Sequence, residues 1–539
     1  MVTPDLPHAS NVCSLARKLL AIDKKRFLPI AIGALTLMGS AVSADNTKPN
    51  VLILVTDDQG WGDVGYHGGE MSTPNIDQLA KDGLEMNRWY SYPICSPTRV
   101  SLLTGHISMR HKIFSPIPAN LTIPHDEQLM NQAFKEAGYM TMTAGKWHLG
   151  MTHARDLPIN RGFDHTYGSL RAGPDYWTHG RGEQKDWARD GKTVFESGYM
   201  TDLFGNEISR LIRERDPAKP FFSYVAFTAP HTPLQAPQEY VDKYAHIEDE
   251  NRRIYCAMVE VLDVAIGNIL KAIDDEGIRD NTLVLFFSDN GPTPTGDAGG
   301  FRGQKGRLYE GGTRMPAIFR WPGKIPAGVK SEQPMVVYDL FPTLVEALDI
   351  PTNLNTPFDG ESLWDVLQTG GVRERETDMI IGNGTAYSVH SGDYKLVHSN
   401  INKNTPNAPP ELVELFKIYD DPNETNNVAD SHPDVVARIM GDNAVFADMV
   451  RNAPFREGRR GRGARAAGGS GGRPGVGAAG GRAAGGPDGG RVATDGGRPG
   501  GRPGGVAGGR PGGAAGGGPA PARDADGNII HLHESLPRG

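Results

Sequence analysis

Near-continuous apolar runs separated by helical stretches constrain the fold of this 539-residue chain more than any other feature. Residues 51–58 (VLILVTDD) and 283–291 (LVLFFSDNG) are typical of strands that are buried on both faces. Residues 220–227 predict a third such strand, and residues 315–322 predict a fourth. The helical patterns between them cover residues 75–86, 127–138 and 252–273. This alternation predicts an α/β domain with a mainly parallel central sheet sandwiched by helices.

The pattern changes after Trp364. The runs MIIGNG, AYSVHSG, YKLVHS and LFKIYDD predict a small antiparallel sheet, and residues 432–450 predict one helix that closes it. We place the boundary near residue 375. A large domain then covers residues 45–375, and a small C-terminal subdomain covers residues 376–456.

Both ends of the chain differ from its middle. Residues 457–539 are rich in Gly, Arg and Pro and predict a disordered tail. A flexible linker, an arm that attracts polyanions and a segment without function are the alternatives for this tail. At the other end, Lys24–Arg26 precede an apolar run and the small residues Val42–Ala44, which predicts a signal peptide over residues 1–44. The apolar run is short for a membrane span, although an uncleaved anchor is the alternative.

Charge and signal removal limit the expected partners. The formal net charge of −8 argues against a general affinity for nucleic acid, so we expect no nucleic-acid partner. A cleaved signal predicts export to the periplasm or secretion, with no stable membrane insertion afterwards.

Cysteine usage excludes a disulfide framework. Cys13 lies in the predicted signal peptide, so the mature chain keeps only Cys95 and Cys256. Cys256 lies among apolar residues at helical spacing, which predicts a small buried side chain on a core helix.

The surroundings of Cys95 are unusual. Residues 96–104 predict a short helix, with Ser96 as N-cap, a proline at the first helical position and a glycine after the last. Cys95 then lies at the positive end of the helix, and Arg99 returns to the same side one turn later. Such a group predicts a receptor for a tetrahedral oxyanion, while a structural role for Cys95 is equally compatible with these residues.

Acidic side chains follow two of the predicted strands. Asp57 and Asp58 end the first, and Asp289 and Asn290 end the strand at residues 283–291. Carboxyl ends of strands in an open α/β sheet meet at one edge, where neighbouring carboxylates repel each other unless a cation is bound. The all-oxygen donor set favours a hard ion, Ca²⁺ or Mg²⁺, over Zn²⁺. The alternative is that each pair only caps a loop or a helix.

Several motifs together resemble one known family. CSPTRVSLLTG (95–105) resembles the signature of the formylglycine-dependent sulfatases, and AGKWHLG (144–150) resembles their second signature. Four more motifs occur in the family's order: Asp57-Asp58, SDNG at 288–291, TAPHTPLQAP around His231, and RGQKGRLYEGGTRMP around Lys305. The resemblance covers residues 48–365, and RGFDHTYGSLRAGPDYWTH is similar to the arylsulfatase B-like, N-acetylgalactosamine-4-sulfatase subgroup. Thr98 replaces the commoner serine, and the cysteines of the subgroup's animal disulfides are missing.

The resemblance implies a fold and two prosthetic features. The fold is an alkaline-phosphatase-like large domain with a small C-terminal antiparallel sheet and a helix. Cys95 would be oxidised to formylglycine by a formylglycine-generating enzyme. A Ca²⁺ ion, or alternatively Mg²⁺, would contact residue 95 and be held by the strand-end side chains Asp57, Asp58, Asp289 and Asn290.

The resemblance also implies catalytic roles. Arg99 and Lys146 would stabilise the formylglycine hydrate and the sulfate charge, and Lys305 would bind sulfate near the leaving oxygen. His148 would assist the release of sulfate, and His231 would donate a proton to the departing alcohol.

The expected function is that of a sulfuric ester hydrolase, which releases inorganic sulfate from a sulfated sugar or an aryl sulfate. A phosphonate or phosphate monoester hydrolase of the same superfamily is one alternative. A non-catalytic secreted glycan-binding protein is the other.

Overall fold

The computed structural model describes residues 48–117 and 121–454. The predicted signal peptide and Gly/Arg/Pro tail lie outside the described residues. None of the helices in these two ranges combines the length and the apolar character needed to cross a bilayer.

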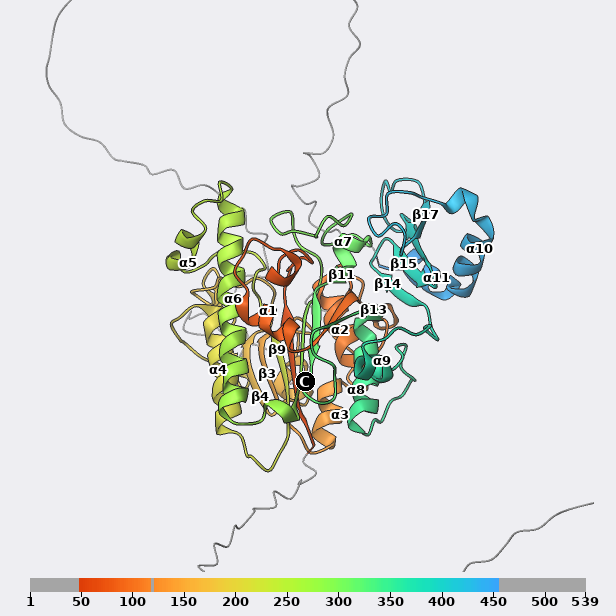
Figure 1. Cartoon of the computed structure of the whole chain (residues 1–539). Helices are drawn as coiled ribbons and strands as arrows, with labels where there is room; N and C mark the ends of the chain where they lie inside the picture. The colour runs from red at the N-terminus through yellow and green to blue at the C-terminus, as the bar shows by residue number, and fades with distance from the viewer. Residues whose placement is uncertain (1–47, 118–120, 455–539) are drawn as a thin grey trace, which may run out of the picture. The chain divides into compact units, whose positions relative to one another are not determined.

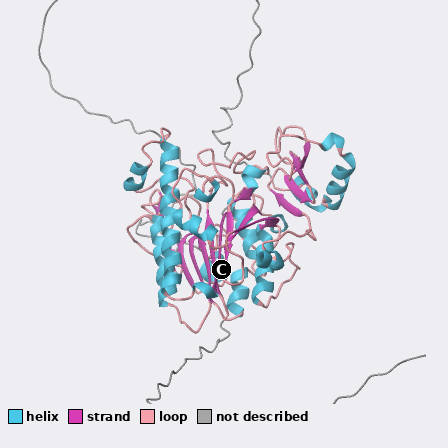
Figure 2. Ribbon diagram, in the orientation of Figure 1, coloured by secondary structure: helices cyan, strands magenta, loops and turns pink. Residues whose placement is uncertain are grey.

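A parallel sheet forms the centre of the large domain (Figures 1 and 2). Its five central strands lie in the order β10 (Thr282–Ser288), β1 (Asn50–Thr56), β9 (Phe221–Ala226), β3 (Met140–Lys146) and β4 (His165–Ser169). All pairs among them are parallel. Every residue of β1, β9 and β10 is buried, so the prediction of strands covered on both faces is confirmed.

Helices cover both faces of this sheet. Alternate residues of β1 enter different cores: Leu52 and Leu54 pack with α1 (Pro74–Lys81), α4 (Met200–Glu214) and α6 (Glu250–Asp275). Val51 and Ile53 pack with α2 (Cys95–Thr104), α3 (Met130–Glu136) and α8 (Leu340–Leu348). The remaining short helices of the large domain are α5 (Gln238–Lys243), α7 (Glu310–Thr313) and α9 (Trp364–Thr369).

The sheet is extended at both edges. Beyond β10 lie β12 (Ala317–Arg320), β2 (Leu84–Tyr90), β13 (Val329–Val336) and β11 (Arg314–Met315), and beyond β4 lie β7 (Ala188–Arg189) and β8 (Lys192–Thr193). The helix predicted over residues 75–86 is therefore too long. It ends at Lys81, and the Asp82-Gly83 turn leads directly into β2.

The small C-terminal sheet is antiparallel, as predicted. Its strands are β14 (Met379–Gly382), β15 (Tyr387–Ser391), β16 (Tyr394–Ser399) and β17 (Leu412–Lys417). The single helix predicted over residues 432–450 is wrong, because α10 (Pro433–Asp442) and α11 (Ala444–Arg451) are separate. Asn443 lies between them with non-helical backbone angles (φ −110°, ψ 19°), and its Nδ2 donates to Asp378 Oδ2 (3.0 Å).

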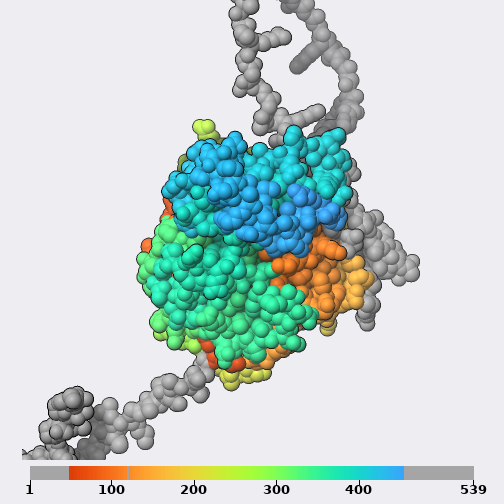
Figure 3. Space-filling model, turned by 90° about the vertical axis from the view of Figure 1, so that its right-hand side faces the viewer, coloured from red at the N-terminus to blue at the C-terminus, as the bar shows by residue number. Residues whose placement is uncertain are grey.

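The C-terminal helices also contact the segment that follows α2. The Arg110 guanidinium lies 5.3 Å from the centre of the Phe446 ring of α11. In the space-filling view, the C-terminal residues (blue) adjoin the surface of residues near position 100 (orange) (Figure 3). This contact ties the small sheet and its helices to the region just beyond Cys95.

Candidate active site

The ends of β1 and β10 bring four oxygen-bearing side chains together. The two strands pair with Thr56 opposite Ser288, so the residues that follow them leave the sheet at the same level. The Asn290 amide donates to Asp58 Oδ1 (2.7 Å), and the Asp58 N–H donates to Asp289 Oδ1 (3.4 Å). Asp57 and these three residues are all buried.

Three cationic side chains surround these acids. Lys146, the last residue of β3, donates to Asp57 Oδ2 (2.5 Å), and Lys305 donates to Asp58 Oδ1. Arg99 on α2 donates twice to Asp289 Oδ2, from Nη2 (2.7 Å) and Nε (3.1 Å). The buried charges of the three carboxylates are therefore paired, which is what makes their burial tolerable.

The pairing shapes the pKa values of the acids. Burial alone raises the pKa of Asp57, but the charges of Lys146, His231 and Arg99 outweigh it and hold that pKa well below its usual range. Burial, followed by the neighbouring charge of Asp57, raises the pKa of Asp289 to about 6. Asp57 is thus fully ionised at neutral pH, whereas Asp289 takes up a proton more readily than a free aspartate does, as expected for like charges in one site.

Three buried oxygens of the site have no hydrogen-bond partner within the described part of the chain: Asp57 Oδ1, Asp58 Oδ2 and Asn290 Oδ1. Buried acceptors are seldom left unpaired, so each of them calls for an explanation. Carboxylate and amide oxygens are donors that suit Ca²⁺ or Mg²⁺. The residues present therefore fit a hard divalent cation.

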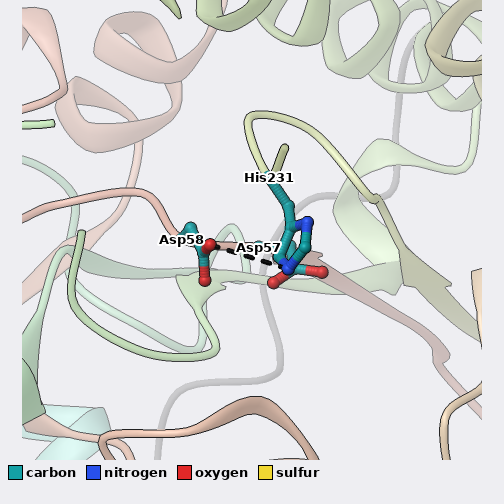
Figure 4. Close-up of side chains that lie close together, drawn as sticks. All are labelled: Asp57, Asp58 and His231. Atoms are coloured by element: carbon teal, nitrogen blue, oxygen red, sulfur yellow. Dashed lines mark ion pairs between the residues drawn. The ribbon is translucent and has the colours of Figure 1, made fainter. Parts of the chain in front are cut away.

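His231 lies beside this group. Single ligand atoms of Asp57, Asp58 and His231 all lie within 4.8 Å of one another, and His231 Nε2 is 3.8 Å from Asp58 Oδ2 (Figure 4). Its Nδ1 is 2.6 Å from the Thr232 carbonyl oxygen, and burial lowers the pKa of the imidazole. The ring therefore stands at the rim of the acidic group with Nε2 turned toward it.

Cys95 and His148 are in contact. Cys95 Sγ lies 3.3 Å from His148 Nδ1, and the thiol is only 2% exposed. Burial raises the pKa of the Cys95 thiol although Lys146 and Lys305 act to lower it, so an unmodified thiol here is protonated at neutral pH. Burial, with Lys146, lowers the pKa of His148 well below its ordinary value, which leaves a neutral imidazole.

The start of α2 differs from the prediction. The helix begins at Cys95 with Ile94 at the N-cap position, so Ser96 is not the cap. Ser96 Oγ instead donates to the His148 carbonyl (3.0 Å) and accepts from the Ile117 N–H (3.0 Å). These tertiary partners take the hydroxyl away from the helix terminus and fasten Cys95 to the His148 loop.

Two site residues hold unusual backbone conformations. Asp58 and His148 have φ values of 67° and 57°, in the left-handed region that non-glycine residues rarely adopt. Such strain costs roughly 1–3 kcal/mol per residue and is concentrated at functional sites. Asp58 follows β1 and His148 follows β3, and these backbone conformations direct the Asp58 side chain to Lys305 and the His148 side chain to Cys95.

Two supporting residues were not predicted as part of the site. The Tyr224 hydroxyl on β9 accepts from Arg99 Nη1 (3.3 Å), and Thr98 Oγ1 donates to the Asp289 carbonyl (2.6 Å). Tyr224 lies within a predicted strand, but nothing in its local sequence marks it as a partner of Arg99. Its role arises only because β9 lies between β1 and β3.

Neither Cys95 nor Cys256 forms a disulfide in the described structure. Cys256 is buried on α6, as predicted, with Sγ 3.8 Å from Glu70 Oε1. The described cysteines therefore separate into one at the acidic centre and one in the core.

Comparison with known proteins identifies the family of this chain. Residues 49–350, more than half of the chain, match the family model described as Sulfatase. Arylsulfatase J of Mus musculus is 35% identical over 358 residues, which cover 63% of this chain and 59% of that protein. N-acetylgalactosamine-6-sulfatase of Canis lupus familiaris is 32% identical over 394 residues, covering 67% of this chain and 74% of that protein.

A solved structure agrees with these relatives. Ps i-CgsB in complex with k-i-k-neocarrahexaose superimposes with a TM-score of 0.68 at 28% identity, covering 76% of this chain and 95% of that one. The fold is thus the alkaline-phosphatase-like α/β fold. The chain belongs to the sulfatase family and is a sulfatase enzyme. These relatives do not single out the arylsulfatase B-like subgroup, which stays a prediction.

Proposed function

We propose that this sulfatase releases inorganic sulfate from a sulfated sugar or an aryl sulfate, using formylglycine formed from Cys95 and a divalent cation held at the strand ends. The observation that carries the proposal is the group of three unpaired buried oxygens on Asp57, Asp58 and Asn290, flanked by Lys146 and Lys305. Such a site is prepared to hold a hard cation and, next to it, a tetrahedral anion.

Different groups of the site have different roles in the proposed reaction. The cation, held by the strand-end oxygens, would supply positive charge to the sulfate group. The aldehyde hydrate of residue 95 would supply the nucleophile toward sulfur. Lys146 and Lys305 bind the sulfate oxygens, and Arg99 keeps Asp289 in place from a fully buried position.

The two histidines handle protons. His231 lies at the partly exposed rim, where its protonated form would donate a proton to the departing alcohol oxygen. The neutral His148 imidazole, whose Nδ1 lies 3.3 Å from Cys95 Sγ, would accept a proton from the modified side chain of residue 95 when sulfate is released.

Several features outside the site complete the proposal. A sulfated glycan fits the substrate class, because the structural neighbour Ps i-CgsB is in complex with k-i-k-neocarrahexaose. We also propose that residues 1–44 direct export and that a formylglycine-generating enzyme is the maturation partner. In this scheme residues 45–375 carry the reaction, and residues 376–456 form the C-terminal subdomain.

Mass analysis of the tryptic peptide with residue 95 tests the nucleophile. Enzyme from a formylglycine-competent host is expected to show the mass of the aldehyde, and Cys95→Ala is expected to lose at least about 10³-fold of its sulfate release. Cys256→Ser is the matched control and is expected to keep full activity. A free thiol at position 95 in fully active enzyme would contradict the proposal.

Paired substrates test the reaction class. The same aryl group is offered as its sulfate and as its phosphonate, and the sulfate is expected to turn over faster. Preference for the phosphonate would favour the alternative hydrolase, and glycan binding without any sulfate release would favour a binding protein. A panel of glycans with defined sulfation, including 4-O- and 6-O-sulfated N-acetylgalactosamine, then identifies the linkage.

A further inference from the structure

Residues 302–310, here called the Lys305 loop, contact both the reaction centre and the small C-terminal sheet. On the reaction side, the Lys305 N–H donates to the Pro292 carbonyl (2.9 Å), two residues beyond Asn290. The Gly306 N–H donates to the Pro93 carbonyl (2.7 Å), two residues before Cys95. The loop is therefore fastened to the chain on both sides of the proposed cation and nucleophile.

A buried charged cluster fastens the other end of this loop. Glu310, five residues after Lys305, accepts from Lys395 Nζ (2.9 Å) on β16. Lys395 Nζ also lies 2.9 Å from Glu424 Oε1, and the side chains of both Lys395 and Glu310 are fully buried. Figure 1 shows α7, which begins at Glu310, beside the small sheet.

The small sheet and the turn after β17 hold the backbone of the loop as well. Glu424 accepts from the Glu310 N–H (2.6 Å), so both the backbone and the side chain of Glu310 are held by this part of the chain. The Asn383 amide, in the β14–β15 turn, donates to the Gly306 carbonyl (3.3 Å), next to Lys305. Arg302, at the start of the loop, donates to the Glu414 carboxylate (3.2 Å).

A buried ion pair is an expensive way to gain stability, because removing two charges from water costs as much as their attraction returns. Its best-attested use is to specify one arrangement of the groups that it joins. The pair between Glu310 and Lys395 joins residues 85 positions apart. The only other basic groups near Glu310 among the described residues are Arg314 at 3.7 Å and His390 at 3.9 Å.

We propose that Lys395 is a positioning residue for the reaction: it clamps the Lys305 loop to the small C-terminal sheet and so sets Lys305 Nζ where the sulfate group binds. The clamp rests on the proposed role of Lys305. Through its contacts with the Lys305 loop, the small sheet would then take part in binding sulfate. Lys395 acts through Glu310 and does not touch the substrate.

Lys395→Met in the full-length chain tests the clamp. We expect kcat/KM for an aryl sulfate to fall by about tenfold to a hundredfold, as for a catalytic group displaced by about 1 Å. Inhibition by inorganic sulfate is expected to weaken in parallel, a readout that loss of stability alone would not move. The double variant with Lys305→Ala is expected to be no worse than Lys305→Ala alone, because both changes remove the same contribution.

Leu396→Ala is the matched control. Leu396 is the next residue of β16 and faces the opposite side of the strand, in the apolar core. It is expected to lower the melting temperature and to leave kcat/KM and sulfate inhibition within about twofold at a temperature where the protein is folded.

Two further variants keep the test decisive if Lys395→Met does not fold. Asn383→Asp keeps the Oδ1 acceptor for the Thr385 N–H but removes the donor to Gly306, and a severalfold loss of sulfate affinity is expected. Glu310→Gln with Lys395→Met removes both charges of the Glu310–Lys395 pair, so neither is left buried without the other, and this double variant is expected to fold but to bind sulfate weakly.

Unchanged kcat/KM and sulfate inhibition in folded Lys395→Met or Asn383→Asp would overturn the clamp, and so would an effect that adds to that of Lys305→Ala. A wild-type enzyme that releases no sulfate would instead refute the proposed function.

Discussion

The pair between Lys146 and Asp57 supports a quantitative prediction about stability. Both side chains are fully inaccessible to solvent, and Nζ lies 2.5 Å from Oδ2. Lys146→Met keeps much of the volume of the side chain and removes its charge. Breaking a buried pair in this way costs about 3–5 kcal/mol, because one charge stays buried without its partner.

A neighbouring arginine limits the free-energy cost of losing Lys146. Arg99 Nη2 remains 3.6 Å from Asp57 Oδ2 and compensates part of the lost attraction, so we expect the lower end, about 3 kcal/mol. Roughly 400 described residues with an unfolding entropy of about 2.1 cal/mol/K each convert this loss into about a 4 °C lower melting temperature.

Thermal unfolding followed by circular dichroism measures the effect, with a chelator present so that no cation replaces the lysine. Asp57→Asn and the double variant complete a double-mutant cycle, and a coupling of about 1–3 kcal/mol is expected. A melting temperature within about 1 °C of the wild type, or strictly additive effects, would refute the reasoning.

Cation binding, the ionisation of His106 and the packing around Gly145 can each be tested by a stability measurement. Ca²⁺ at about 100 times its dissociation constant is expected to raise the unfolding free energy by about 2.7 kcal/mol over chelated enzyme, and an unchanged melting curve would contradict the cation site. Burial lowers the pKa of His106, but Asp359 and Glu127 outweigh it and raise that pKa to about 9. This folded-state pKa lies above the unfolded value of about 6.5, so the protonated His106 stabilises the fold fully below about pH 6.5 and loses this effect as the pH rises toward about 9. The difference in unfolding free energy between the wild type and His106→Gln should therefore shrink between about pH 6.5 and about pH 9. Gly145→Ala is expected to cost at least about 1–3 kcal/mol, because its Cβ would stand 1.9 Å from the Ala226 carbonyl oxygen; a neutral effect in urea unfolding would refute this.

The strands that carry the acids were predictable because their signal is local. A continuous apolar run that ends in Asp57-Asp58 needs no knowledge of its neighbours to be identified as a buried strand. By contrast, β3 has the sequence MTMTAGK and β4 has HTYGS, where Thr and Gly weaken the apolar pattern. Both strands are nevertheless central, because pairing with β9 and packing of helices against the sheet outweigh weak local preference.

The amino-acid sequence by itself determined the α/β class, the acidic strand ends and the family resemblance, because each depends on residues that are close along the chain. Only the tertiary structure decided that Tyr224 supports Arg99, that Ser96 binds the His148 loop and that Lys395 reaches Glu310. These contacts join residues that are 52 to 125 positions apart, and no local pattern encodes the partner of a polar group over such separations. The partners are fixed when the core packs, because burying a polar group without a hydrogen-bond partner costs several kcal/mol. That cost is a large fraction of the net stability of a folded protein.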